Sequence, residues 1–139
     1  MSIVQTQTTS FKSQLYQGIH DLTTDVIKIA LYTGNASLNE DTTAYTTSNE
    51  IVATGYTAGG KVMTGITINT SGYTAYVNFD NVTWTPGAFT ARCALIYNSS
   101  KGDKSIAVLD FGSDKTTTST FTITMPANTA TAALIRSSN

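Results

Sequence analysis

Apolar and polar residues alternate along most of the chain, which predicts a protein built mainly of β-strands. In residues 26–33, VIKIALYT, the side chains of Ile27, Ile29 and Leu31 would share one clearly apolar face. The same two-residue period, or a short apolar run of strand length, recurs down the chain. It predicts eight strands, at residues 26–33, 50–55, 62–68, 73–79, 89–97, 106–111, 120–125 and 131–136.

The stretch at residues 89–97 is the most apolar of these predicted strands. Strict alternation would put Ala91, Cys93 and Leu95 on one of its faces. Hairpin-sized turn signals join most of the strands, including NTSG at residues 69–72 and a Pro-Gly pair. No helical pattern separates one strand from the next, which excludes parallel strand–helix–strand construction.

Eight antiparallel strands in one domain indicate a mainly β fold, an antiparallel β-sandwich for which we favour the jelly-roll topology. The pairing order does not follow from the sequence, so an immunoglobulin-like sandwich is the open alternative. We see no internal repeat and no linker that would divide the chain. A length of 139 residues fits a single domain that needs no disulfide or metal to hold it together.

The N-terminal part of the chain differs from the rest. Residues 1–9 are polar and rich in threonine, without a sustained period, and we interpret them as an extended N-terminal arm. A short helix then follows, with Thr9 and Ser10 as N-cap candidates. Its apolar face would consist of Phe11, Leu15, Ile19 and Leu22. The predicted organisation is therefore an arm at residues 1–9 and one β-sandwich domain at residues 10–139.

Composition narrows the classes of partner. Only 12% of the residues are charged and the formal net charge is −1, so no basic stripe is present to bind nucleic acid or a membrane surface. The first residues, MSIVQTQTTSF, do not resemble a signal peptide. Threonine is the most unusual feature, with 27 residues in 139. Because β-branched threonine suits a half-solvated sheet, we expect a surface rich in hydroxyl groups that lies against other proteins without charge repulsion.

One stretch, GYTAGGKV at residues 55–62, approaches the pattern of a phosphate-binding loop. Such a loop needs a Ser or Thr after the lysine and a helix that follows. Here Val62 takes the hydroxyl position, and a predicted strand follows where the helix would begin. We therefore interpret the glycines as a bend at positive φ between two strands. Tyr56 would pack at the core edge or on a neighbouring subunit, and Lys61 would be solvated.

Other candidate chemistry has a plainer structural interpretation in each case. His20 lies near Asp21 and Asp25, but no nucleophile motif accompanies it, so we expect a polar residue at a helix end. Cys93 is the single cysteine, which excludes an intramolecular disulfide and indicates a buried, inert thiol.

The nine carboxylates are scattered. Glu40 with Asp41, and Asp110 with Asp114, are the closest groups, and nothing favours a glycosidase arrangement of either. A calcium site at residues 39–41 is an alternative, although the usual calcium-loop spacing is absent. We expect no cofactor, no metal and no enzymatic activity.

Trp84, Tyr73 and Tyr76 suggest a rival interpretation, an aromatic platform that binds a sugar. A tryptophan beside a Pro-Gly turn also commonly closes the core of a sandwich, which is the simpler expectation.

Several segments resemble small virion proteins of tailed bacteriophages, in particular the cement, or decoration, proteins on capsids of short-tailed phages. The resemblance covers about residues 11–112 and rests on FKSQLYQGIHDLTTDVIKIALYT, YTTSNEIVATGYTAGGKVMTG, VTWTPGAFTARCALIYNSS and AVLDFG. It implies a jelly roll on the capsid exterior that binds the major capsid protein, associates as a dimer or trimer and reinforces the shell. No catalytic motif belongs to the family.

The expected function is therefore structural, with the protein located on the virion exterior. We expect inter-subunit contacts from Ile3, Val4 and Gln5 of the arm, because an extended arm commonly adds to a neighbour's sheet edge. Further expected contacts come from the 34–50 loop, the bend and the C-terminal segment, through Tyr45, Tyr56 and Arg136. The alternatives are a tail-associated virion protein and a carbohydrate-binding β-sandwich module.

Overall fold

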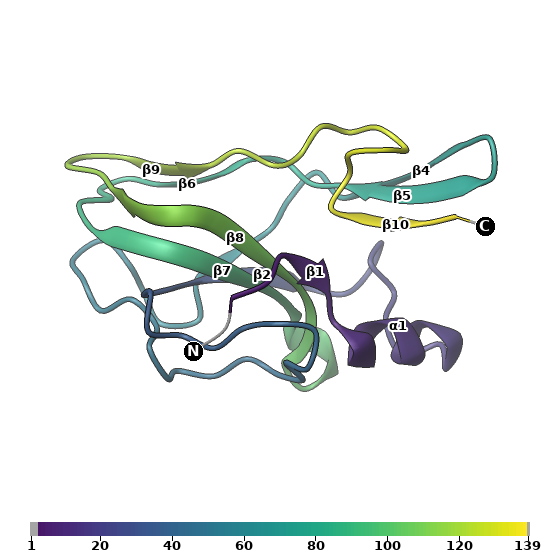
Figure 1. The fold of residues 1–139 in the computed structure, drawn as a ribbon, viewed down its shortest axis with the longest axis horizontal. Coiled ribbons are helices and arrows are strands. Elements are labelled where there is room, and N and C mark those ends of the chain that lie inside the picture. The colour runs from purple at the N-terminus through teal and green to yellow at the C-terminus, as the bar shows by residue number, and fades with distance from the viewer. Residues whose placement is uncertain (1–2, 139) are drawn as a thin grey trace.

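Most of the predicted strands are present, and they form a mainly β protein with one short α-helix (Figure 1). The computed structural model describes residues 3–138. Its larger sheet has the order β1-β8-β7-β2-β3, and every neighbouring pair is antiparallel. These strands are Thr6–Gln7 (β1), Lys104–Thr116 (β8), Thr90–Asn98 (β7), Ile27–Tyr32 (β2) and Lys61–Val62 (β3).

A second layer lies over one face of this sheet and consists of two smaller antiparallel sheets, β10-β5-β4 and β6-β9 (Figure 1). The layers confirm the predicted antiparallel β-sandwich, with ten strands among residues 3–138 where about eight were expected. The strand order does not confirm the jelly-roll topology, which stays a prediction. The strands of this layer are Thr67–Ser71 (β4), Thr74–Asn78 (β5), Val82–Trp84 (β6), Phe121–Ile123 (β9) and Ile135–Ser137 (β10).

The main core lies between the two layers. Ile27, Ile29 and Leu31 all belong to it and are fully buried, as the alternation in β2 predicted. The upper layer adds a group of aromatic rings, in which Trp84 and Phe121 meet edge to face. Burial of side chains of this size contributes about 1.5–3 kcal/mol each, so this core is the main stabilising contact between the layers.

A second, smaller core, which we call the outer core, covers the opposite face of the five-stranded sheet. Here the 33–50 segment crosses below the sheet and buries Ala36 and Leu38 against it (Figure 1). As a result β2 and β7 are buried on both faces, and much of the loop expected to meet neighbouring subunits packs within its own chain. The cluster comprises Ala30, Tyr32, Ala36, Leu38, Cys93, Leu95, Tyr97 and Val108.

The predicted face of β7 is wrong at one position. Cys93 and Leu95 share the outer core, but Ala91 lies in the main core. The ladder between β7 and β8 is irregular between Ala91 and Cys93, where several residues of β8 oppose a single residue of β7. The faces of β7 change at this irregularity, so Ala91 and Cys93, two residues apart, pack on opposite sides of the sheet.

Two other predicted strands differ from the structure. Residues 50–55 form no strand, because the chain pairs with β2 only at a Tyr32–Glu50 bridge and then turns at Gly55, which has φ 92°. The predicted strand at 62–68 is divided between β3 and β4. At the division, Gly65 has φ 64°, and a Cβ there would come within 2.2 Å of the Asp80 carboxylate.

The helix α1 (Thr9–Tyr16) confirms the predicted short helix but begins one residue earlier than its expected caps allow. Its N-cap is Thr8, whose hydroxyl accepts a hydrogen bond from the amide of Phe11 at 3.3 Å. Phe11 is fully buried, and Leu22 packs in the same core beyond the end of the helix.

The N-terminal arm is extended, but part of it belongs to the body of the protein. Thr6 and Gln7 pair with Val108 and Ala107 of β8. Thr8 is fully buried, and its hydroxyl lies 2.9 Å from that of Ser105. Residues 6–8 therefore complete a sheet edge of their own chain. An arm that joined a neighbouring subunit would leave this edge unpaired.

Candidate interaction site

The GYTAGGKV stretch is a bend organised around an internal carboxylate. Gly55, Gly59 and Gly60 all have positive φ, as predicted. The amide of Gly59 donates a 2.8 Å hydrogen bond to Glu50, a carboxylate that is only 7% exposed. An acidic side chain thus binds the amide that a phosphate would need. The glycine bend is confirmed, but it leads into β3 from a segment that forms no strand.

Two tyrosine hydroxyls complete the shell around Glu50. Tyr56 donates to Oε2 at 2.5 Å, and Tyr45 donates to Oε1 at 2.6 Å. Burial, together with the hydrogen bond to Glu50, raises the pKa of both tyrosines well above the usual range, so both remain donors. Tyr56 packs in the main core, the first of its two expected positions, and so offers little surface for a contact to another subunit. Tyr45 is half-buried and stacks on Tyr97 with ring centres 4.7 Å apart.

Lys61, at the end of the bend, is exposed, as expected. Its ammonium group also donates to the carbonyl oxygen of Thr83 at 2.6 Å and lies 5.8 Å from the centre of the Trp84 ring. The lysine therefore covers the edge of β6.

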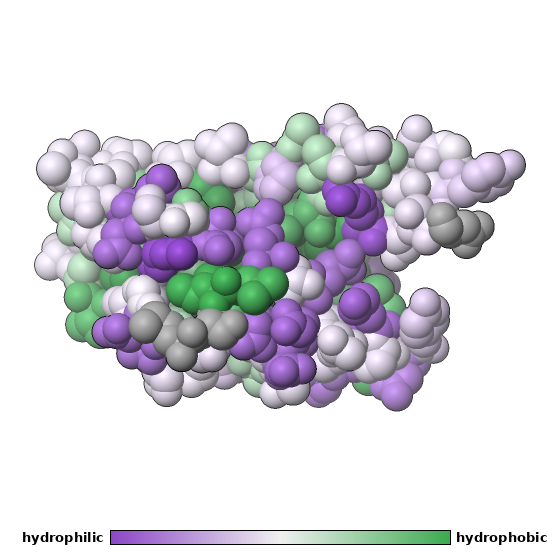
Figure 2. Space-filling view, viewed as in Figure 1, coloured by the Kyte–Doolittle hydropathy of each residue, from purple (hydrophilic) through white to green (hydrophobic). Residues whose placement is uncertain are grey.

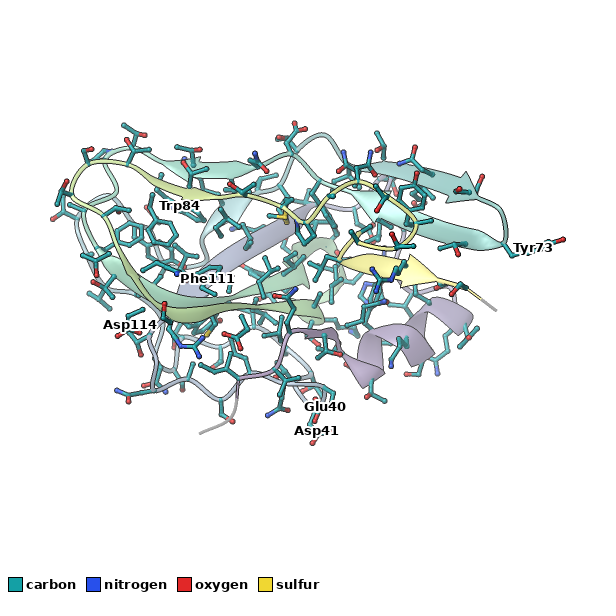
Figure 3. The ribbon with its side chains drawn as sticks, turned by 45° about the horizontal axis from the view of Figure 1, so that its top comes forward. Glu40, Asp41, Tyr73, Trp84, Phe111 and Asp114 are labelled. Atoms are coloured by element: carbon teal, nitrogen blue, oxygen red, sulfur yellow. The ribbon has the colours of Figure 1, made fainter. Side chains whose placement is uncertain are left out.

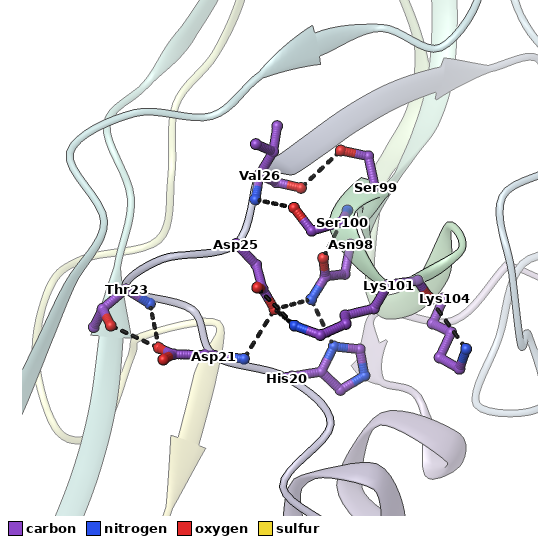
Figure 4. A network of polar contacts seen from close by, with 10 residues as sticks. All are labelled: His20, Asp21, Thr23, Asp25, Val26, Asn98, Ser99, Ser100, Lys101 and Lys104. Carbon is purple, nitrogen blue, oxygen red and sulfur yellow. Dashed lines mark hydrogen bonds and ion pairs between the residues drawn. The ribbon is translucent and has the colours of Figure 1, made fainter.

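His20 belongs to a polar network that ties the segment after α1 to the end of β7 (Figure 4). Its Nε2 lies 2.7 Å from Oε1 of Gln14, and its Nδ1 lies 3.0 Å from the amide nitrogen of Asn98. The Asn98 amide also donates to Asp25 at 2.8 Å, and Lys101 pairs with the same carboxylate at 2.8 Å. Burial opposes the charge on Asp25, but the hydrogen bonds from Asn98 and Lys101 outweigh it and lower its pKa to about 2.

This geometry assigns a structural role to His20. A neutral ring with its proton on Nε2 donates to Gln14 and accepts from Asn98 at Nδ1. A second proton on Nδ1 would face the Asn98 amide, which is itself a donor. Burial also lowers the pKa of His20, with Asp25 acting in the opposite direction and Lys101 in the same one.

We expect the protein to lose stability as the pH falls below about 6.5, the unperturbed pKa of histidine. Because the pKa of His20 is lowered in the folded state, the unfolded chain takes up the proton first, and linkage then favours unfolding. Urea unfolding at pH values between about 7 and 5 measures the effect. His20 is the single histidine, so a His20→Gln variant should show a flatter profile over this range. An unchanged slope in that variant would assign the pH dependence to other groups.

The remaining candidates for chemistry lie apart from one another. Cys93 is buried, and burial raises its pKa to about 12. Asp110 pairs with Arg92, whereas Asp114 lies away from Glu40 and Asp41 (Figure 3). Asn39 is the first residue of the proposed calcium loop, and its side-chain oxygen accepts a hydrogen bond from the amide of Asp41 at 2.9 Å. Among residues 3–138, no three His, Cys, Asp or Glu side chains are grouped as a metal site would require.

The aromatic platform for a sugar is not assembled. Trp84 is 1% exposed and belongs to the main core, as its simpler interpretation predicted. Tyr73 is 90% exposed at the tip of the β4–β5 hairpin, at the other end of the molecule from Trp84 (Figure 3). The Trp84-based sugar platform therefore has no structural support.

The predicted contact residues of the arm form one small apolar area. Val4 is partly exposed, and Ile3 packs against the outer core while bridging to Leu38. Figure 2 shows an apolar patch beside the grey N-terminal residues, where this segment lies. Gln5 is exposed, and its side-chain oxygen accepts a hydrogen bond from the amide of Asp110 at 3.1 Å, so it already has a partner within its own chain.

A larger candidate surface, which we call the hairpin groove, lies between α1 and the β10-β5-β4 sheet. Two adjoining hollows of about 380 and 370 Å³ form it and share Leu15, Arg136 and Ser137. Figure 2 shows the molecule hollowed at this end, between the projecting hairpin and the helix. Arg136 is the one predicted contact residue that lines the groove, where it also donates to the carbonyl oxygens of Thr131 and Ala133.

Sequence reasoning missed the other residues of this surface. Leu15 and Tyr16 of α1 and Ile68 of β4 are all exposed large apolar side chains at the groove. One signal was available for the hairpin tip. SGYT at 71–74 predicts a two-residue turn with glycine first, and the next residue, Tyr73, must then project into solvent.

Comparison with known proteins gives no relative: no family model, no curated protein and no solved structure matches this chain. None of the helices in residues 3–138 is long and apolar enough to cross a membrane.

Proposed function

We propose that this protein is a structural virion protein that binds the outside of a phage capsid, associates with itself and cements neighbouring capsomers. The proposal combines the sequence resemblance to phage cement proteins with the character of the hairpin groove. No catalytic step is part of it.

The observation that carries the proposal is the group of exposed apolar side chains at one end of the molecule. Tyr16, 94% exposed, lines the groove with Leu15 and Ile68, and Tyr73, 90% exposed, lies at the tip of the hairpin that forms one wall. Single exposed apolar residues are ordinary, but several around one hollow are typical of a protein interaction site. Tyrosine is also enriched at interfaces, because its ring contributes apolar area and its hydroxyl still finds a polar partner.

The surroundings of the groove suit a protein partner. The outward strand β4 presents threonine, asparagine and serine with no charged residue. The charged residues that line the groove itself are Lys12, Arg136 and Asp21, which include both signs. Such a surface approaches another protein closely without strong repulsion, and symmetric repetition on a shell would multiply weak contacts into avidity.

We expect the double variant Tyr16→Ser with Tyr73→Ser to decorate capsids at least about tenfold more weakly than the native chain, because buried interface tyrosines commonly contribute 1–2 kcal/mol or more each. Both side chains are almost fully exposed, so the free energy of unfolding should change by less than about 1 kcal/mol. Purified protein would be titrated onto undecorated capsids and the bound fraction measured by sedimentation.

Val52→Ser is the matched control, since Val52 is 98% exposed and does not line the groove. Labelling in virions provides an independent test. A copy number that matches the capsomers supports the cement function. A few copies at one vertex would contradict it and favour a tail-associated protein.

A further inference from the structure

Most sheet edges in residues 3–138 are protected against pairing with another chain. An exposed edge strand is a template for association unless it is short, charged, bulged or covered. β1 and β3 have two residues each, and β6 and β9 have three. The edge strand β10 contains Arg136, and Gln7 donates to the Arg136 carbonyl oxygen at 3.0 Å.

The outer part of β8 is also protected. Beyond β1 it contains Asp110, Asp114 and Lys115, and it bulges opposite β7. The backbone amide of Asp110 already donates a hydrogen bond to the Gln5 side chain. Gly112, with φ 83°, interrupts the extended conformation. A regular strand could not add to this edge without displacing those contacts.

β4 is different. It is the five-residue segment Thr67–Ser71, TINTS, with no charge, no proline and an unbroken register with β5. It is the last strand of the β10-β5-β4 sheet, so every second backbone amide and carbonyl points away from β5. Among residues 3–138, no backbone group of β4 bonds to anything but β5. The β4–β5 hairpin also projects beyond the five-stranded sheet, which therefore does not cover this edge (Figure 1).

We propose that β4 pairs with β4 of a second copy of this chain, antiparallel about a two-fold axis, to give one continuous six-stranded sheet. A site that meets its own copy across a two-fold axis must be self-complementary. An edge without charge meets this condition, because no like charges are brought together. The pairing gives the self-association proposed above a defined surface.

The apolar residues fix the register. Ile135, Val77 and Ile68 are direct neighbours across β10, β5 and β4 and form one row on the groove side of the sheet. Exposure rises along this row, from 3% at Ile135 to 52% at Ile68. With Ile68 placed opposite Ile68 of the second copy, the row continues across the axis and both half-exposed isoleucines become buried. A shift of one residue would instead set Ile68 opposite asparagine or threonine and place the two isoleucines on opposite faces of the sheet.

Ile68→Lys tests the pairing on the purified chain without capsids. The native protein should approach twice its chain mass of 14.8 kDa as its concentration rises in sedimentation experiments. The variant should dimerise at least about tenfold more weakly, because two lysines would then face each other. Val62→Lys is the matched control: Val62 is 54% exposed on edge strand β3, and the side-chain change is the same. The control should dimerise like the native chain.

Ile68→Cys tests the register. Residues directly opposite each other in an antiparallel pair have Cα atoms about 4.5–5.5 Å apart, which is within disulfide range. Mild oxidation should therefore give a covalent dimer of Ile68→Cys and none of Val52→Cys, while the buried Cys93 stays unreactive.

A native chain that stays monomeric would overturn the pairing, as would a dimer that Ile68→Lys leaves intact. Capsid decoration is measured separately, so its loss or retention bears on the cement function and not on the β4 pairing. A monomeric native chain whose capsid binding is lost in Ile68→Lys would assign the edge to a strand of another protein.

Discussion

Replacing Gly60 by alanine is expected to abolish stable folding. Gly60 has φ 80°, and a Cβ at this position would lie 1.7 Å from the carbonyl oxygen of Ile29 and 2.8 Å from Cα of Ala30. Both are backbone atoms of the central strand β2, which is packed on both faces and cannot move aside. We expect a loss of more than about 4 kcal/mol, a large share of the 5–15 kcal/mol that stabilises an ordinary domain. Soluble yield and the urea unfolding midpoint measure it.

Gly72→Ala separates the clash from the cost of a left-handed backbone. Gly72 has a similar φ of 58°, but nothing lies within 4 Å of its ideal Cβ. Alanine there should lose only about 1–2 kcal/mol, the usual cost of the left-handed conformation. Equal losses in the two variants would show that close packing of the bend against β2 is not what requires Gly60.

The sequence predicts best the residues whose alternation marks the face toward the main core. Ile27, Ile29 and Leu31 are an example, because every second residue of β2 packs in that core and the period is unbroken. The bend at 55–61 was also predictable, since positive φ at several positions needs glycine and leaves a direct mark in the sequence.

Long-range packing decided the features that the sequence did not predict. Residues 34–50 show no period, yet Leu38 of this segment covers the outer face of the sheet. The nearly continuous apolar character of β2 was the available signal, because a strand buried on both faces has no polar side. The Ala91 face was not predictable, since the bulge depends on how β8 pairs with β7.

The candidate site was predicted only in part. Arg136 lies at the hairpin groove, but Tyr56 is buried and Gln5 binds within its own chain. The groove forms where α1 meets strands more than fifty residues away along the chain, so no local pattern marks it. Glu50 was missed for the opposite reason: its partners are close in sequence, but their convergence depends on the glycine bend.

Glu50→Ala is expected to destabilise the fold by about 3–5 kcal/mol, because it removes the acceptor of a buried, charged hydrogen-bonding centre. Three donors would lose their partner: the hydroxyls of Tyr45 and Tyr56 and the amide of Gly59. Tyr56 is 8% exposed, so water does not replace the carboxylate without opening the core. Urea unfolding monitored by Trp84 fluorescence would report the loss, since the ring centres of Tyr56 and Trp84 are 6.1 Å apart.

Glu50→Gln is the matched control. The amide keeps the size of the side chain and one carbonyl oxygen, which continues to accept from Tyr56 and Gly59. Its NH2 group turns toward the Tyr45 oxygen, which is able to accept a hydrogen bond. Only the charge is lost, and because charged hydrogen bonds are about twice as strong as neutral ones, we expect a milder loss of about 1–2 kcal/mol. Equal losses for the glutamine and alanine variants would show that the charge alone matters.

A double-mutant cycle between Glu50→Ala and Tyr45→Phe then isolates one contact of this centre. Tyr45 makes its hydroxyl bond to Glu50, so removing that hydroxyl should cost stability in the native chain. In the Glu50→Ala background the same hydroxyl has already lost its acceptor, and its removal should cost less, with a coupling of at least about 0.5 kcal/mol. Additive losses would contradict a shared centre. A measured coupling would show that Tyr45 and Glu50 stabilise this near-match to a phosphate loop as one centre, through the carboxylate that also accepts from Gly59.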